Sequence, residues 1–232
     1  MKEKSILFQD FDERTREVSK YLMLIKNLEQ GTIQLSMGVN KQKIRKIESD
    51  LEKTLKATSF LLLYNLTEST MRNAIEIIFD ELSKEGISFD KIRKEIKVII
   101  IKNIQNNHSP ENLLNKINTI AVDIISASFD RDKLFSGNLD AKKIRKTAET
   151  YGFSCKTDSR KTGNGSDLLT VKIHRNDLAH GVKSFKEVGK DVSADELLKI
   201  KKKVVSYLKQ ILQNIETYLA NKEYLNSSTE TL

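Results

Sequence analysis

The segment HRNDLAHG, residues 174–181, concentrates polar and ionisable side chains immediately before a glycine. It fits a helix that ends near Gly181, so Asn176 and His180, four residues apart, are expected on one helical face. Arg175 lies about 100° around the axis from Asn176, and its long side chain can reach the same space. Histidines exchange protons near neutral pH, and guanidinium groups stabilise charged phosphoryl oxygens. The segment therefore predicts a site for proton transfer and phosphate recognition.

Two simpler explanations compete with this prediction. A histidine in the last turn of a helix is often only a favourable residue beside a glycine C-cap. His174, Asp177 and His180 also form an H-x-x-D-x-x-H pattern that could ligate a metal. His174 and His180 lie about 120° apart around a helix, however, which disfavours a shared metal ion. We therefore expect neither a metal nor another cofactor.

A second polar cluster interrupts a long apolar segment, at spacings of three, four and four residues: Asn65, Glu68, Arg72 and Glu76. Glu68 precedes Arg72 by four residues, which is the favourable order for an ion pair on a helix. The stripe either faces solvent or supports the first cluster by orienting Arg175 or His180. Both interpretations fit the spacing equally well.

The positive charge of the chain is concentrated around the opening segment. The net charge is +8, and residues 140–209 alone hold 17 basic and 9 acidic side chains, which is also a net of +8. A positive field of this kind attracts polyanions such as nucleic acid. A solvated, lysine-rich face is the plainer alternative.

The composition indicates a helical protein that positions these clusters. The 232 residues include one proline and nine glycines, so few residues interrupt helices rich in Leu, Ile, Lys and Glu. We predict an all-α bundle of five to seven helices with a long central helix. The helical segments expected from apolar spacing, caps and glycines are about 8–30, 43–84, 90–106, 109–129, 140–151, 167–180 and 193–224. Residues 154–166 are polar and glycine-bearing and are expected to form a loop.

Three of these segments together resemble a known superfamily. Arg175, Asn176 and His180 form the R-N-x-x-x-H version of the RX4–6H motif, near the end of a helix that one further long helix follows. The motif and its surroundings resemble a bacterial branch of stand-alone HEPN nucleases (higher eukaryotes and prokaryotes nucleotide-binding domains). The matching segments are LLLYNLTESTMRNAIEIIFDEL at 61–82, SGNLDAKKIRKTAETYGF at 136–153 and VKIHRNDLAHGVKSFKEVG at 171–189. The resemblance covers about residues 53–224.

The resemblance implies a HEPN-type helical bundle that dimerises and cleaves RNA without a metal. Arg175 and His180 would be catalytic, with Asn176 as a third polar member of the site. The same resemblance favours a supporting role for four polar residues, Asn65, Glu68, Arg72 and Asp177. The basic residues that we expect to contact RNA are Lys142, Lys143, Arg145, Lys172 and Lys183. The predicted activity is that of an endoribonuclease, acting as a toxin or an antiviral-defence effector.

One departure from the family concerns regulation. In HEPN toxins that are silenced by nucleotidyltransferase antitoxins, a tyrosine two residues after the motif histidine receives the nucleotide, and this chain has Val182 there. An antitoxin or defence-system partner would therefore have to act by another route. The alternative function is a non-catalytic RNA- or nucleotide-binding HEPN module that assists another defence protein. A purely structural scaffold would explain the core but not the motif or the local charge.

The remaining expectations concern organisation and location. We expect residues 1–232 to form a single HEPN-like nuclease domain, with residues 1–45 as a helical N-terminal extension and residues 225–232 as a frayed tail. The lone Cys155 excludes an intrachain disulfide and fits a reducing cytoplasm. No signal-peptide-like or membrane-spanning apolar segment is apparent, so no membrane association is expected.

Overall fold

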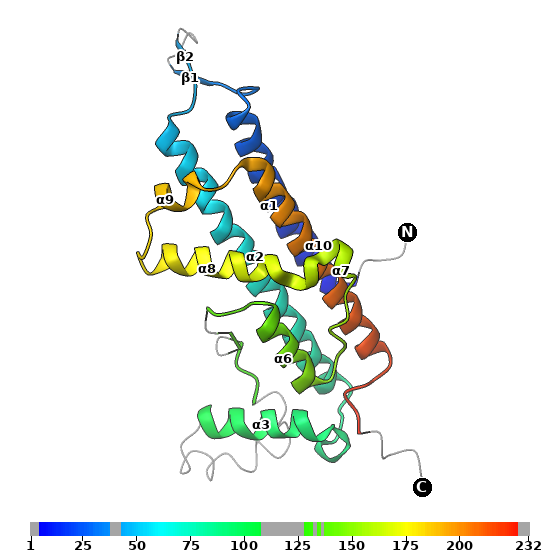
Figure 1. Ribbon diagram of the computed structural model, residues 1–232. Coiled ribbons are helices and arrows are strands. Elements are labelled where there is room, and N and C mark those ends of the chain that lie inside the picture. The colour runs from blue at the N-terminus through cyan, green and yellow to red at the C-terminus, as the bar shows by residue number, and fades with distance from the viewer. Residues whose placement is uncertain (1–4, 38–42, 108–127, 132–133, 136, 227–232) are drawn as a thin grey trace. The chain divides into compact units, whose positions relative to one another are not determined.

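The computed structural model describes residues 5–37, 43–107, 128–131, 134–135 and 137–226, and the regular elements in these residues are nearly all helices (Figure 1). The larger helices are α1 (Ile6–Glu29), α2 (Ser49–Lys84), α3 (Lys94–Asn107), α6 (Ala141–Tyr151), α8 (Ser166–Ala179) and α10 (Ala194–Ala220). Shorter pieces are α7 (Ser159–Thr162), α9 (Phe185–Lys190) and the 3-10 turns η1 (Phe89–Lys91) and η3 (Gly163–Gly165). Strands β1 (Leu35–Met37) and β2 (Lys43–Arg45) pair antiparallel in a small ribbon. The all-α prediction is therefore confirmed for the described residues.

The chain divides into two compact units, and the boundaries fall inside two long helices. Unit 1 comprises residues 1–69 and 157–209, and unit 2 comprises residues 70–156 and 210–232. Helices α2 and α10 each contribute one part to each unit. Whether the chain acts as the single domain that the sequence indicates stays a prediction.

An ion cluster around the buried Lys56 joins three helices of unit 1. The ammonium group of Lys56 in α2 is 3.2 Å from a carboxylate oxygen of Glu29 in α1 and 3.2 Å from one of Glu52. The other oxygen of Glu29 accepts a hydrogen bond of 3.0 Å from the backbone N–H of Ala194, the first residue of α10. The last residue of α1 therefore caps the first turn of α10, where free N–H groups favour a negative charge.

In unit 2 aromatic side chains hold the helix ends together. Tyr218 of α10 donates a hydrogen bond of 2.7 Å to the carbonyl of Tyr151 at the end of α6. Phe79 of α2 packs against Tyr151 with ring centres 6.1 Å apart. Beyond α10, the carbonyl of Tyr224 accepts from the N–H of Arg93, and Asn226 donates to the carbonyl of Lys91. The segment expected to fray from residue 225 is thus hydrogen-bonded as far as residue 226, and residues 227–232 lie outside the described part.

Several helix ends follow the sequence signals. Asp140 accepts a hydrogen bond of 2.9 Å from the N–H of Lys143 and so caps α6, which ends at Gly152 with φ of +93°. The Ser193 hydroxyl accepts from the N–H of Glu196 while the Glu196 carboxylate accepts from the N–H of Ser193, and the two bonds form a capping box at the start of α10. These two starts are confirmed.

Other element boundaries differ from the prediction. The second helix was expected from residue 43, but it begins at Ser49, and residues 43–45 form strand β2. A three-residue strand is too short to show an alternating pattern. The helical spacing of the leucines that follow it therefore extended the predicted helix over these residues. The third helix begins at Lys94, after the turn η1. The expected loop at 154–166 contains α7 and η3, and α9 was not predicted at all. The helix predicted at 109–129 lies almost wholly outside the described residues.

Candidate functional site

Helix α8 carries the motif residues and places them at its end. The α-helix extends to Ala179, and His180 is the C-cap residue, with its N–H donating a 3.0 Å bond to the carbonyl of Asn176. Gly181 follows with φ of +67°, a conformation that favours glycine and terminates the helix. The His180 side chain is exposed. The predicted helix end at Gly181 is confirmed, and it leaves the imidazole open to a ligand.

Arg175 is held in place by two neighbours. Its Nη1 donates a hydrogen bond of 3.0 Å to the Oδ1 of Asn176. Its guanidinium carbon lies 4.6 Å from the centre of the Tyr64 ring in α2. That distance is typical of a cation–π contact, and Tyr64 is only 3% exposed. A half-buried arginine fixed on a buried ring loses less conformational freedom when it binds an anion than a free arginine does.

His174, the residue before Arg175, has a different environment. Its ring centre lies 4.4 Å from that of Phe60 in α2, with a tilt of 40°. Its Nδ1 atom is buried and has no hydrogen-bond partner in the described part of the chain. Burial, and secondarily the charge of Lys183, lowers the pKa of His174 below its ordinary value. His174 therefore acts as a neutral packing residue between α8 and α2.

Asp177 shapes the turn that follows α8. Its carboxylate is 3.0 Å from the ammonium group of Lys183. Its carbonyl accepts hydrogen bonds from the N–H groups of Val182 and Lys183. The salt bridge and the backbone hydrogen bonds together hold residues 182 and 183 against the last helical turn of α8.

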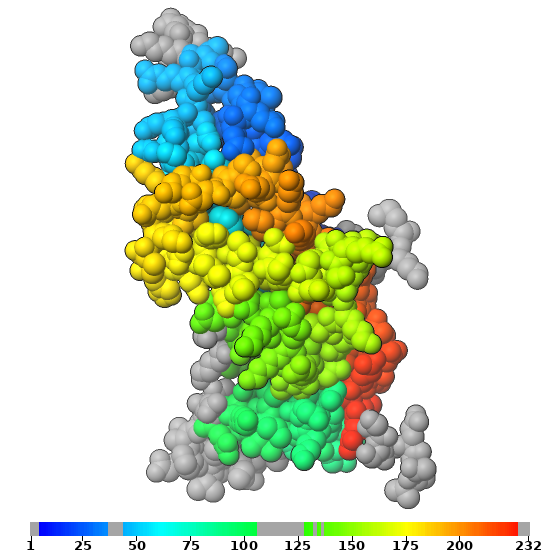
Figure 2. Space-filling view, viewed as in Figure 1, coloured from blue at the N-terminus to red at the C-terminus, as the bar shows by residue number. Residues whose placement is uncertain are grey.

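The exposed side of α8 combines apolar and motif residues. Leu169 and Ile173 are 47% and 46% exposed, and they precede Asn176 and His180 at helical spacings of four, three and four. All four therefore lie on one face of the helix. Figure 2 shows the yellow α8 surface facing the viewer. An apolar stripe that leads directly to a polar motif is typical of a contact surface.

The predicted supporting residues have various partners. Asn65 is exposed, and its Oδ1 accepts a hydrogen bond of 3.1 Å from Arg14 in α1. Glu68 is half-buried on α2. Arg72 belongs to unit 2, where it donates hydrogen bonds to the carbonyls of Arg131 and Phe135. That Asn65, Glu68 or Arg72 orients the motif stays a prediction.

The basic residues expected to contact RNA occur in both units. Lys142, Lys143 and Arg145 are exposed on α6 of unit 2. Lys172 on α8 and Lys183 in the turn after it belong to unit 1. Lys183 already forms a salt bridge with Asp177, so the carboxylate partly neutralises its charge.

Two residues of α2 escaped the sequence analysis. Phe60 and Tyr64 carry the rings on which His174 and Arg175 pack. In the sequence both residues look like ordinary core residues. An aromatic residue at helical spacing does not indicate whether a charged side chain packs against its ring. Their pairing with α8 depends on how the two helices cross, which Figure 1 shows.

Among the described residues, no three His, Cys, Asp or Glu side chains come together as candidate metal ligands. No helix in the same residues has the length and apolar character needed to cross a membrane.

Comparison with protein families identifies a family that covers this chain. Residues 4–224, nearly the whole chain, match the family described as HEPN_MAE_28990-like HEPN. No curated protein and no solved structure is significantly similar to the chain.

Proposed function

Because this chain belongs to the HEPN_MAE_28990-like HEPN family, we propose that it is a metal-independent endoribonuclease with Arg175 and His180 as its catalytic residues. One observation carries the proposal. The Arg175 guanidinium is held on the Tyr64 ring, while the His180 imidazole is exposed at the end of the same helix. RNA cleavage by 2′-oxygen attack uses both kinds of group, a cation beside the phosphate and an acid–base group that can reach it.

The proposed reaction is attack by the RNA's own 2′-oxygen on the adjacent phosphorus. A base removes the 2′-hydroxyl proton, the O2′–P bond forms and the P–O5′ bond breaks, and an acid delivers a proton to the leaving 5′-oxygen. The products are a 2′,3′-cyclic phosphate and a 5′-hydroxyl. The His180 imidazole can serve as base or acid. Arg175 stabilises the negative charge that builds on the phosphoryl oxygens, and Asn176 keeps the guanidinium in position through its 3.0 Å hydrogen bond.

In-line attack needs its acid and its base on opposite sides of the phosphorus, and one imidazole cannot serve both sides at once. We propose that a second copy of the chain supplies the other His180 in a two-fold dimer. A two-fold interface brings identical patches together. The exposed stripe of Leu169 and Ile173 lies on the same helical face as His180, so burial of the stripe would bring both motifs to one cleft.

RNA affinity is assigned to the basic residues of both units. Lysines and arginines bind the phosphate backbone without sequence preference, and their contribution falls as salt rises. The candidates are Lys142, Lys143, Arg145, Lys172 and Lys183. In the cell, we propose that the nuclease is a toxin or a defence effector restrained by a partner protein. Val182 stands where related toxins carry a modifiable tyrosine, so that partner would act without modifying this position.

The decisive experiment compares His180→Ala with Val182→Ala. Val182 is 70% exposed two residues away, so its truncation tests any general disturbance of the turn. We expect Val182→Ala to cleave RNA normally and His180→Ala to lose about 10²–10⁴-fold in rate while it binds RNA normally. Wild-type products should carry cyclic phosphate ends and form equally well in EDTA.

Arg175→Ala should also lose cleavage, with some loss of RNA affinity because it removes a phosphate contact. Wild-type expression should arrest bacterial growth, and His180→Ala expression should not. Cleavage by His180→Ala at the wild-type rate would reject the nuclease proposal and favour the non-catalytic RNA- or nucleotide-binding module.

A further inference from the structure

A pocket in unit 2 lies between α3, α6 and residues 130, 134 and 135. Its volume is about 280 Å³, just below the usual range of about 300–1,000 Å³ for small-molecule sites. Helix α6 contributes one continuous face, with the side chains of Lys143, Lys146, Thr147, Thr150 and Tyr151. Helix α3 contributes Ile99 and Asn103, and the intervening segment contributes Asp130, Leu134 and Phe135. None of these residues belongs to the motif on α8.

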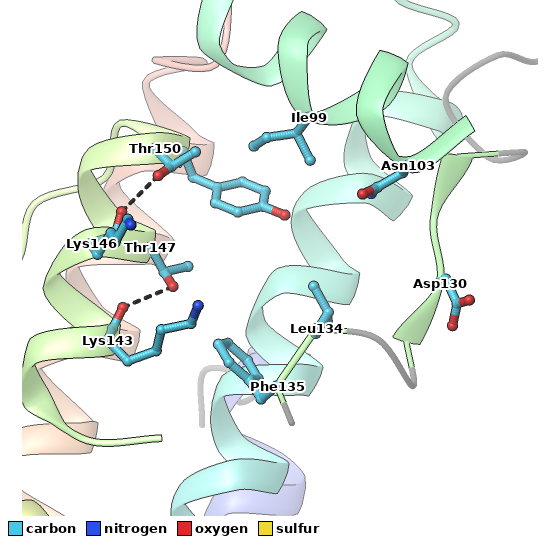
Figure 3. Close-up of a pocket in the computed structure, with 10 residues that line it drawn as sticks. Ile99, Asn103, Asp130, Leu134, Phe135, Lys143, Lys146, Thr147 and Thr150 are labelled. Carbon is cyan, nitrogen blue, oxygen red and sulfur yellow. Dashed lines mark hydrogen bonds between the residues drawn. The ribbon is translucent and has the colours of Figure 1, made fainter. Parts of the chain in front are cut away.

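The pocket has an apolar wall and a cationic rim. Ile99 and Leu134 are half-buried and, with Phe135, which is only 4% exposed, form an apolar wall against which a flat ring can pack. Lys143 and Lys146 are exposed at the other side, and neither has a salt-bridge partner among the described residues. Figure 3 shows Lys143 extending from α6 toward Phe135. A ligand with a flat ring and an anionic group would satisfy both sides.

The hydroxyl and amide groups add directional contacts. Thr147 and Thr150 each donate to a carbonyl of α6, at 3.0 Å and 2.7 Å, so their hydroxyl oxygens keep only acceptor capacity for a ligand. Asn103 supplies both a donor and an acceptor, and Asp130 supplies acceptor oxygens. Such groups suit the edge of a base or the hydroxyls of a sugar.

The aromatic wall is held from behind by α2. Arg72 donates hydrogen bonds to the carbonyls of Arg131 and Phe135, and its guanidinium carbon is 6.0 Å from the centre of the Phe135 ring. Arg131 in turn lies 3.2 Å from a carboxylate oxygen of Glu76 and donates to the Oδ1 of Asn73. The polar residues of α2 thus anchor one wall, which gives the pocket a defined shape.

We propose that this pocket binds one nucleoside phosphate unit, with its base against the wall of Ile99, Leu134 and Phe135 and its phosphate at Lys143 and Lys146. The unit can be a free mononucleotide or one nucleotide of an RNA strand, because both present the same ring, sugar and phosphate. The proposal does not depend on the nuclease assignment, since the lining residues are all in unit 2 and include neither Arg175 nor His180.

The test uses Lys143→Gln/Lys146→Gln and a charge-matched control, Lys94→Gln/Lys102→Gln. The control lysines are exposed on α3 of the same unit and do not line the pocket. All four side chains are exposed, so both variants should melt like the wild type. Titration calorimetry of the full chain measures binding of each nucleoside monophosphate, and of ribose 5-phosphate and inorganic phosphate as probes without the base. Fluorescence anisotropy measures the binding of a short 2′-O-methyl oligoribonucleotide. This RNA cannot be cleaved by the proposed reaction, because it has no 2′-hydroxyl group.

If the ligand is a free mononucleotide, we expect the wild type and the control variant to bind it with the same affinity. The pocket variant should bind it at least about tenfold more weakly. Inorganic phosphate and ribose 5-phosphate should bind more weakly than the mononucleotides. If mononucleotides do not bind but the oligonucleotide loses affinity in the pocket variant and not in the control, the pocket is a subsite for an RNA strand. Equal losses in pocket variant and control would overturn the proposal. So would inorganic phosphate or ribose 5-phosphate binding as tightly as a mononucleotide.

Discussion

Tyr64 determines how much freedom the Arg175 side chain retains, since the guanidinium carbon lies 4.6 Å from its ring centre. If Arg175 is catalytic, Tyr64→Leu should lower the cleavage rate about tenfold, because a half-buried cation–π contact contributes about 1–2 kcal/mol. Tyr64→Phe keeps the ring and should cleave at nearly the wild-type rate. Single-turnover kinetics at saturating protein, with melting curves for each variant, check this expectation. Equal rates for the leucine and phenylalanine variants would show that the ring does not position the arginine.

His174 should make stability depend on pH. Burial lowers the pKa of His174, so the folded chain resists the proton that an unfolded histidine accepts below about pH 6.5. The stabilising contribution is therefore fully present above that pH and is lost as the pH falls below it and through the lower pKa of the folded chain. His174→Phe removes the titration while retaining a ring against Phe60.

Urea unfolding at about pH 7 and about pH 5 measures the difference. We expect the wild type to lose more stability than His174→Phe between these two pH values. Identical losses in the two proteins would mean that His174 titrates in the folded chain as it does in the unfolded chain.

At the scale of elements, α9 approaches α2 so closely that only glycine fits the contact. A Cβ atom on Gly189 would lie 1.8 Å from the backbone oxygen of Lys53. Gly189→Ala should therefore force the two helices apart and destabilise the fold by about 1–3 kcal/mol. Lys190→Ala, at the next and exposed position of α9, is the matched control and should unfold like the wild type. Chemical denaturation distinguishes the two, and a wild-type midpoint for Gly189→Ala would contradict this packing.

The capping box of α10 should contribute to stability and not to chemistry. Ser193→Ala removes the hydroxyl that accepts from the N–H of Glu196, and a lost N-cap typically costs about 1 kcal/mol. The Glu29 carboxylate still accepts from Ala194, so α10 should keep its start. Thermal unfolding should show a lower midpoint with unchanged RNA cleavage per folded molecule. An unchanged midpoint would mean that the Glu29 contact alone is sufficient.

For the whole molecule, the proposed dimer makes a prediction about one apolar stripe. Ile173→Lys should yield a monomer, because a charge on the exposed face of α8 would be buried at a two-fold contact. Leu24→Lys is the control, since Leu24 on α1 is 45% exposed against 46% for Ile173. Sedimentation at several concentrations should find the control dimeric, and cleavage should fall with the dimer. A dimeric Ile173→Lys protein would place the contact elsewhere.

Mixed dimers give a second test of the same assembly. A subunit with His180→Ala combined with a wild-type subunit should cleave far more slowly than half the wild-type rate, because each cleft would then hold one imidazole in place of two. Half the wild-type rate would instead indicate that each subunit acts alone.

Local signals in the sequence determined the helical class and several helix ends. The Asp140 and Ser193 caps and the glycines at 152 and 181 act through backbone groups within a few residues, so they can be read without knowing the fold. The motif on one helix was readable for the same reason, because Arg175, Asn176 and His180 share a single turn and a half. The short strand β2 and helix α9 were missed, since elements of a few residues carry too little periodicity.

Contacts between distant segments were decided only by tertiary structure. Tyr64 under Arg175, Phe60 against His174, and the Lys53 carbonyl against Gly189 each join residues more than a hundred positions apart. The same holds, over a shorter separation, for the hydrogen bonds that Arg72 donates to the carbonyls of Arg131 and Phe135. Sequence periodicity specifies which face of a helix is polar, but the partner of that face depends on the crossing of helices, which is set by the packing of the whole core.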